Sequence, residues 1–298
     1  MFGLIGPEFY GVWKDAVDLF RKDTAGAPRL GLLSVFNGVG NMVVACSMLM
    51  IASGGVDILN HPVKEDILNL WGIHHTLMLV CRLERGATLW MGPPCCSWIW
   101  LTRSKSKRTR RNPEGLGWRD SWVHYHNRIA ACVAAIAEQA SRLGVYWVIE
   151  QPASSVLFDF PLVKSVIANC NAASVSLNLG DFGGTSLKPL RLVGTAPWLL
   201  SLPLAHTAAP RTRPLQALST RDADGRVTGT HCLPSHMCCF TPLSSLVIHI
   251  ICGSTAIRFP MFEVLLLHWG VRQLTRWTSA WLWRAVRSTA STRRGLSG

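Results

Sequence analysis

The chain has 298 residues and carries 30 Lys and Arg against 17 Asp and Glu, which gives a net charge of +13. This excess of positive charge favours a polyanionic partner, either nucleic acid or an anionic membrane surface, over an acidic protein substrate. The ten cysteines lack the regular spacing of a small secreted disulfide framework, and the first 25 residues carry seven charged side chains. Both features exclude a secreted disulfide scaffold, so we expect an intracellular protein with reduced thiols and no signal peptide.

Strand and helix patterns alternate between residues 30 and 200, after an amphipathic helical lead-in over residues 1–29. Predicted strands cover residues 30–36, 56–60, 87–91, 145–149 and 174–180, and predicted helices cover residues 42–51, 73–83 and 122–143. Strands separated by helices indicate an α/β fold with a Rossmann-like, mostly parallel sheet and helices on both faces. We therefore predict one main domain over residues 30–200.

Residues 201–298 are predicted to be a linker and a basic tail rich in Trp and Arg, poorly structured apart from a hairpin near residues 221–229. The stretch HCLPSHMCC (231–239) holds five His and Cys residues, but they are too crowded for the usual paired zinc spacing, and we expect no metal site. Residues 271–287 would form a basic amphipathic helix suited to anionic lipid or nucleic acid, and a disordered tail fits them equally well.

An uncharged run over residues 31–56 is about as long as a bilayer span. Its glycines and polar residues favour a division into strand, turn and helix over a single transmembrane helix. A membrane-anchored protein is nevertheless one of the alternatives that the sequence leaves open.

A glycine turn, NGVG, lies between the first predicted strand and its helix. Gly38 and Gly40 would let the backbone pass close to a cofactor, although many such turns bind nothing. Asp57 follows about 20 residues later, where Rossmann-like folds place an acid on a ribose, and Asp66 comes soon after. Either acid could instead be a solvated loop residue or a helix cap.

The segment GPPCCSW (92–98) follows the strand 87–91 and leads into a block of positive charge. Two prolines fix the chain direction and would present Cys95 at the edge of the sheet. The cations behind it would favour the thiolate that a nucleophile needs. Cys96 fits the alternative of a small buried apolar residue better, so we expect its side chain to point inward. The cations of the block are Arg103, Lys105, Lys107, Arg108, Arg110 and Arg111.

Glu150 ends the strand 145–149 in the stretch WVIEQP. A carboxyl group at a buried strand end needs a hydrogen-bond partner, or stays protonated and donates a bond itself. A salt bridge at the sheet edge is the structural alternative.

Taken in order, the glycine turn after a strand, the Asp57-Ile58 pair, GPPC, the basic loop and strand-EQP resemble the cytosine-5 DNA methyltransferase family over residues 30–200. The resemblance implies a class I methyltransferase-like domain that uses S-adenosylmethionine and acts on nucleic acid, with DNA favoured over RNA and the nucleus as the favoured location. It implies that Cys95 attacks C6 of a flipped-out cytosine while Glu150 holds the base. It implies cofactor contacts from Phe36, Gly38, Gly40, Asp57, Asp66 and Pro93, and nucleic-acid contacts from the basic block with Lys188 and Arg191.

The sequence also departs from the family pattern. Ser34 stands where the family usually has an acid, Gln151 replaces an asparagine, and Lys188 and Arg191 only partly replace a Q-x-R-x-R motif. A methyltransferase-like domain that only binds nucleic acid is therefore the other alternative.

Overall fold

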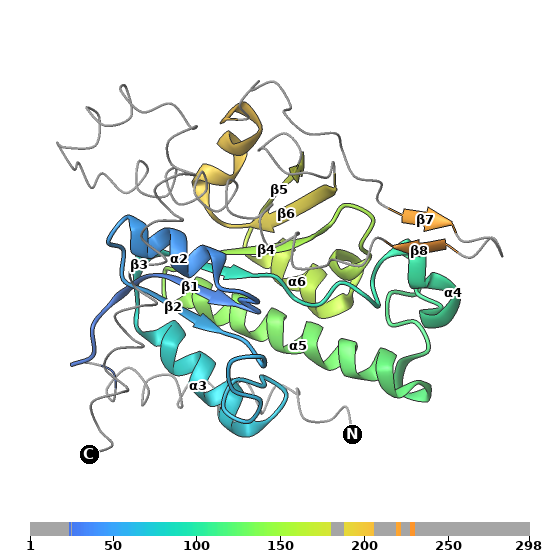
Figure 1. The fold of residues 1–298 in the computed structure, drawn as a ribbon, viewed down its shortest axis with the longest axis horizontal. Helices are drawn as coiled ribbons and strands as arrows, with labels where there is room; N and C mark the ends of the chain where they lie inside the picture. The colour runs from blue at the N-terminus through green and yellow to red at the C-terminus, as the bar shows by residue number, and fades with distance from the viewer. Residues whose placement is uncertain (1–23, 25, 180–187, 206–218, 222–226, 230–298) are drawn as a thin grey trace, which may run out of the picture. The chain divides into compact units, whose positions relative to one another are not determined.

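A six-stranded sheet in the order β2-β1-β3-β4-β6-β5 lies at the centre of the computed structural model, which describes residues 24, 26–179, 188–205, 219–221 and 227–229 (Figure 1). The first four strands of this order are parallel to one another, and β6 is antiparallel to both β4 and β5. The expected Rossmann-like, mostly parallel α/β sheet is confirmed. Its strands are β1 (Leu30–Val35), β2 (Ser53–Val56), β3 (Leu83–Met91), β4 (Tyr146–Pro152), β5 (Ala173–Asn178) and β6 (Pro189–Gly194).

Helices cover both faces of this sheet, as expected (Figure 1). Successive strand residues point to opposite faces. In β1, Leu33 and Val35 join one apolar cluster with α3, α5 and α6, whereas Leu32 joins a second cluster with α2 and the 3-10 segment Pro197–Ala205. The helices are α2 (Asn41–Met48), α3 (Leu70–Cys81), α4 (Arg103–Ser106), α5 (Ser121–Arg142) and α6 (Pro161–Asn169).

The long helix α5 was predicted almost to its ends. The Asp120 carboxylate caps its start by accepting the Val123 N–H at 2.9 Å. After Arg142 the chain turns at Gly144, whose φ of +70° suits glycine, and enters β4. The apolar face of α5 packs on the sheet. The helix lies between β3 and β4 in the chain, and these two strands pair in parallel.

One strand prediction was wrong, and one strand was missed. Residues 56–60 do not form the second strand, because the Asp57 carboxylate accepts the Leu59 N–H at 2.9 Å and turns the chain; β2 ends at Val56. The strand β6 was not predicted at all. Because it runs antiparallel to β4, with Pro152 opposite Leu190, its first residues lie at the carboxyl end of β4.

The uncharged run over residues 31–56 forms most of β1, the eight-residue helix α2, and β2. Within the described residues, none of the helices combines the length and the apolar character needed to cross a bilayer. The predicted hairpin is confirmed by the antiparallel pairing of β7 (Ser219–Arg221) with β8 (Val227–Gly229). The predictions for residues 1–23, 231–239 and 271–287 lie outside the described residues.

Candidate functional site

The glycine turn after β1 is tied to the end of β2 by Asp57. Its Oδ2 accepts the Gly38 N–H at 2.6 Å, and its other oxygen holds the turn that follows β2. Gly38 and Gly40 have φ values of +56° and +82°, which L side chains rarely adopt. A Cβ atom on Gly38 would meet no other atom within 4 Å. The turn therefore presents open backbone at the carboxyl edge of the sheet.

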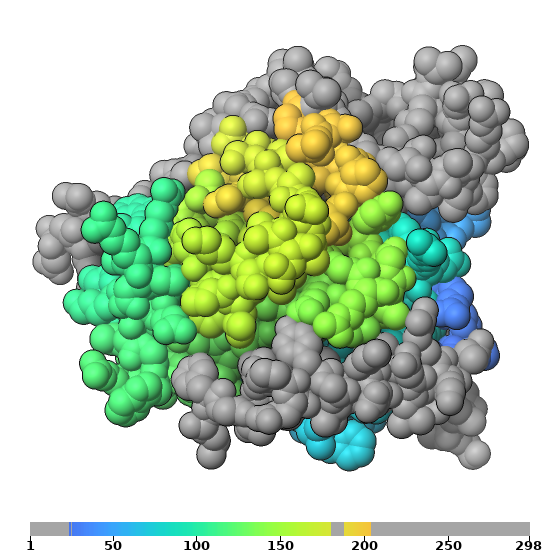
Figure 2. Space-filling model, turned by 180° about the vertical axis from the view of Figure 1, so that it is seen from behind, coloured from blue at the N-terminus to red at the C-terminus, as the bar shows by residue number. Residues whose placement is uncertain are grey.

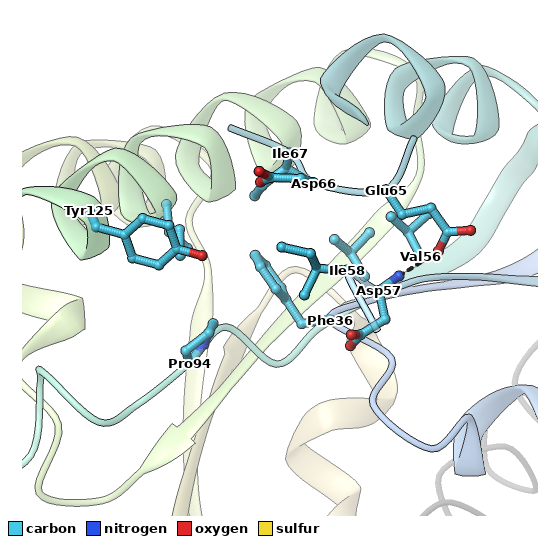
Figure 3. A pocket seen from close by; sticks show the side chains of 11 residues that line it. Phe36, Val56, Asp57, Ile58, Glu65, Asp66, Ile67, Pro94 and Tyr125 are labelled. Atoms are coloured by element: carbon cyan, nitrogen blue, oxygen red, sulfur yellow. Dashed lines mark hydrogen bonds between the residues drawn. The ribbon is translucent and has the colours of Figure 1, made fainter. Parts of the chain in front are cut away.

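Phe36 begins this turn and also has left-handed backbone, with φ +59°. This conformation costs a residue other than glycine about 1–2 kcal/mol. Its side chain lies in a pocket beside the turn (Figure 3). The strained backbone thus accompanies a side chain that lines a pocket, and strained residues cluster at functional sites.

The pocket lies at the carboxyl ends of β1 and β2 and has an empty volume of about 370 Å³, part of it open to solvent. Three of its lining residues are acidic, although the chain as a whole is strongly basic. Figure 3 shows Tyr125 of α5 facing this space from the side opposite Asp57 and Glu65. The lining residues are Val35, Phe36, Val56, Asp57, Ile58, Glu65, Asp66, Ile67, Pro94, Tyr125 and Ile129.

Several of the predicted cofactor contacts lie at this pocket. Phe36, Asp57 and Asp66 line it, whereas Pro94 takes the place expected for Pro93, which is buried. Glu65 was missed: its Oε2 accepts the Asp57 N–H at 2.7 Å and so supports the acid that holds the glycine turn. Its place one residue before Asp66 was the available signal. Tyr125 was also missed, because only the fold brings α5 to this edge.

Cys95 and Glu150 come from neighbouring parallel strands and lie at the same edge of the sheet. Met91 is opposite Ile149, so Gly92 and Glu150 are next in register. A Cβ atom on Gly92 would lie 4.0 Å from Glu150 Oε2. The Glu150 carboxyl group therefore lies beside Gly92, three residues before the Cys95 thiol.

Burial controls the charge of this pair. Loss of hydration raises the pKa of Glu150 to about 7, against the opposing effects of the Lys188 charge and a hydrogen bond from Trp90. Burial likewise raises the pKa of Cys95, while Lys188 lowers it and Glu150 raises it further. The expectation that the basic block lowers the Cys95 pKa is wrong, since burial outweighs the cations and Lys188 is the one that counters it.

Cys96 is an exposed residue and not the small buried one that was expected, although its sulfur contacts a buried side chain. Its Sγ lies 3.3 Å from Nε2 of His126, a buried residue of α5. Burial, and then the charge of Arg108, lower the pKa of His126 to about 4, so its imidazole is neutral near pH 7. The protein therefore holds two adjacent thiols in different settings, one beside a carboxyl group and one beside an imidazole.

Gln151 fixes the proline segment against β4. Its Nε2 donates to the Pro93 carbonyl at 2.6 Å, and its Oε1 accepts the Ser155 hydroxyl at 2.9 Å. The side-chain amide of this residue thus links the chain before Cys95 to the strand that carries Glu150. This link gives Gln151 a structural role at the position where the resembling family has asparagine.

Arg108 is a correction to the predicted nucleic-acid contacts. It is 1% exposed and donates to the Pro113 carbonyl, to Asn127 Oδ1 at 2.7 Å and to the Val123 carbonyl at 3.2 Å. Its guanidinium lies 3.5 Å from the ring centre of Trp98, and burial lowers its pKa to about 10. The buried Arg108 side chain therefore anchors the basic loop to α5. The other predicted cations of the block, Arg103, Lys105, Lys107, Arg110 and Arg111, are exposed.

Lys188 and Arg191 are also engaged within the protein. Lys188 lies close enough to Cys95 and Glu150 to lower both pKa values. Arg191 donates from Nε to the Ser174 hydroxyl at 2.9 Å and lies 4.9 Å from the ring centre of Phe158. The structure thus places Lys188 with the catalytic candidates and keeps both side chains out of the exposed block.

Comparisons with known proteins add little to this geometry. No family model and no curated protein matches the chain. Among solved structures it is similar to the S. pombe Dnmt2 methyltransferase at 12% identity and a TM-score of 0.36, with 64% of this chain and 58% of that chain covered. The chain thus spans less than two thirds of that structure. A likeness of this size says nothing of activity, so the function rests on the residues described above.

Proposed function

We propose that the protein transfers a methyl group from S-adenosylmethionine to C5 of cytosine in nucleic acid, through a covalent adduct with Cys95. One observation carries this proposal: Pro94 lines the acidic pocket, and the next residue is the thiol at the same edge as Glu150. A cofactor site, a nucleophile and a carboxylic acid are thereby contiguous. This is the set of groups that methylation of a poorly nucleophilic ring carbon requires.

Two features of the pocket fit the proposed cofactor: its acidic lining and the exposed backbone of the adjoining glycine turn. S-adenosylmethionine would supply a methyl group activated by a positively charged sulfur. The pocket gathers Asp57, Glu65 and Asp66 in a chain of net charge +13, and such acids favour a ligand with cationic groups. Gly38 and Gly40 do not line the pocket themselves, but Asp57, which does, accepts the Gly38 N–H, so the pocket adjoins the open backbone of the glycine turn.

The roles of Cys95 and Glu150 follow from their protonation. The Cys95 thiol would give up its proton to a base as its sulfur bonds to C6 of the pyrimidine, and the electron pair of the 5,6 double bond would move toward C5 and N3. Glu150, with a pKa of about 7, still holds a proton near neutral pH and can donate it toward N3. C5 would then bond to the methyl group as the bond between that methyl and the cofactor sulfur breaks, so that the cofactor leaves as a neutral thioether. Removal of the C5 proton by a base would re-form the 5,6 double bond and expel the Cys95 sulfur as a thiolate.

The reacting base has to leave its stack before the thiol can reach C6. The exposed cations that follow the two cysteines would hold the phosphates on either side of that base without reading sequence. They supply affinity at the place where the substrate strand must pass.

A binding-only domain is the second candidate, and the raised pKa of Cys95 favours it. A thiol kept neutral by burial is a weak nucleophile at neutral pH. Under this candidate the protein binds nucleic acid through its cations and performs no methyl transfer.

A trapping experiment separates the two candidates. A 5-fluorocytosine oligonucleotide with S-adenosylmethionine should form a covalent complex, because fluorine cannot leave C5 as a proton does. Cys95→Ser should form none, whereas Cys96→Ser, a matched control one residue away, should still form it. Absence of a complex with both DNA and RNA oligonucleotides would remove the catalytic proposal and leave the binding one.

A further inference from the structure

Two tryptophans of the segment 100–119 have most of their surface exposed to solvent. Trp100 is 55% exposed and Trp118 is 74% exposed, and each belongs to a short 3-10 turn. In Figure 2 the segment, coloured green at the left of the view, forms part of the surface. Large flat side chains left in water at two places in one short segment point to a ligand that covers them.

The same segment is strongly cationic. Its only acidic residue is Glu114. Within the described part of the chain the ion pair is that of Arg142 with Glu138, so these exposed cations have no carboxylate partner there. The exposed cations are Arg103, Lys105, Lys107, Arg110, Arg111 and Arg119.

Internal bonds hold this surface in shape. The Leu116 N–H donates to the Ser106 carbonyl at 3.1 Å, and Arg108 ties the enclosed loop to α5. Gly115 permits this closure, because a Cβ atom there would lie 2.3 Å from the Ser106 carbonyl oxygen. A preformed surface needs little further ordering when a ligand binds.

The surface is also attached directly to the proposed reaction centre. The Thr102 hydroxyl donates to the Cys96 carbonyl at 2.6 Å, which joins the turn that carries Trp100 to the pair of thiols. A ligand that lies along the segment would therefore continue to the edge where Cys95 and Glu150 meet.

Exposed indoles distinguish between the possible anionic partners. A single strand offers the flat faces of its bases, on which tryptophan stacks, together with phosphates for the cations. A duplex offers phosphates but keeps its base faces stacked on one another. A lipid surface would favour an amphipathic helix, whereas these tryptophans stand on separate three-residue turns, and the one helix between them, α4, has four residues.

We infer that the segment from Trp100 to Arg119 binds single-stranded nucleic acid, with bases stacked on Trp100 and Trp118 and phosphates held by its exposed cations. This inference rests on the proposed function, since it names the form of nucleic acid that reaches the Cys95 edge. The substrate would then be an unpaired strand or a loop, whose bases need no extraction from a duplex.

Binding of labelled 20-mers to the full-length protein, measured by fluorescence anisotropy without S-adenosylmethionine, tests the inference. The probes are oligo(dT), oligo(rU) and a 20-base-pair duplex. Trp118→Ala and Trp100→Ala should each weaken single-strand binding at least about fivefold and leave duplex binding unchanged. Trp71→Ala is the matched control, because Trp71 is 69% exposed but stands on α3. It should leave both affinities unchanged.

The cations are tested in the same way through salt dependence. Changing Arg103 and Arg110 to Gln should reduce the slope of log affinity against log salt for the single strand by about 1.4. The control changes Arg85 and Lys164, which are exposed on β3 and α6. Their replacement should leave the slope as it is.

Three outcomes would overturn the inference: equal effects of the tryptophan variants on duplex and single strand, no effect on either, or loss of binding to phosphatidylserine vesicles in those variants. These outcomes differ from failure of the proposed function. If no covalent complex is trapped but Trp118→Ala still selectively loses single-strand binding, the proposed binding surface is retained and the proposed methyl transfer is rejected.

Discussion

Replacement of Glu150 by Gln should change how the stability of the protein depends on pH. The amide keeps an oxygen that can accept the hydrogen bond from Trp90, and it cannot ionise. In the wild-type protein the carboxyl pKa is raised from 4.5 to about 7 by burial. The variant therefore removes one titration while it preserves the size and shape of the side chain.

The magnitude follows from linkage. Between pH 4.5 and about 7 the folded protein holds a proton on Glu150 that the unfolded chain has lost. Stability is therefore fully retained below pH 4.5 and declines as the pH rises through this range, by about 1.4 kcal/mol per pH unit. The wild-type protein should lose about 3 kcal/mol relative to Glu150→Gln by pH 7.5.

Urea denaturation at steps of pH from 4.5 to 8, followed by tryptophan fluorescence, measures this difference. Lys188→Gln provides a second reading. Lys188 lowers the pKa of Glu150, so its loss should extend the decline to higher pH. If the free energies of unfolding of the wild type and Glu150→Gln run parallel across the whole range, Glu150 is not held neutral by burial, and its role as a proton donor loses its basis.

Three further predictions concern the turn, the loop anchor and the exposed thiol. Gly38→Val should abolish S-adenosylmethionine binding in calorimetry, whereas Gly86→Val, which has the same left-handed backbone near the start of β3, should lose similar stability and keep the affinity. Arg108→Met should lower the free energy of unfolding by about 3 kcal/mol, because it leaves three acceptors without their donor, while exposed Arg110→Met should change it by less than about 0.5 kcal/mol. Iodoacetamide followed by mass spectrometry should label exposed Cys96 before its neighbour, and the opposite order would contradict the described burial.

The parallel core of the sheet, and the placement of the glycine turn, Cys95 and Glu150 at one edge of it, were predictable from sequence, because both follow from local pattern. An apolar strand precedes each of three segments: the glycine turn, GPPC and EQP. Each of these segments therefore lies at the end of a strand, and parallel strands bring such ends to one edge of the sheet. β3 and β4 are neighbours in the sheet, and their register places Glu150 next to Gly92.

What the sequence did not reveal depends on contacts between distant residues. Nothing local marks Arg108 among its neighbouring cations as the one that turns inward; its burial depends on Trp98 and on Asn127, 19 residues later. The side-chain direction of Cys96 was likewise set by His126, 30 residues away. Charge runs predict a basic surface but leave open which member serves as its anchor.

The direction of β6 has a consequence for any shortened form of the protein. A fragment that ends with β4 at Pro152 would contain the glycine turn, both thiols and Glu150, yet it would lack Lys188, which the antiparallel strand returns to that edge. Without this cation the pKa values of the Glu150 carboxyl group and the Cys95 thiol would both be higher. The set of charged and ionisable groups at this edge is therefore complete only in a chain that extends beyond β5 to Lys188 and β6.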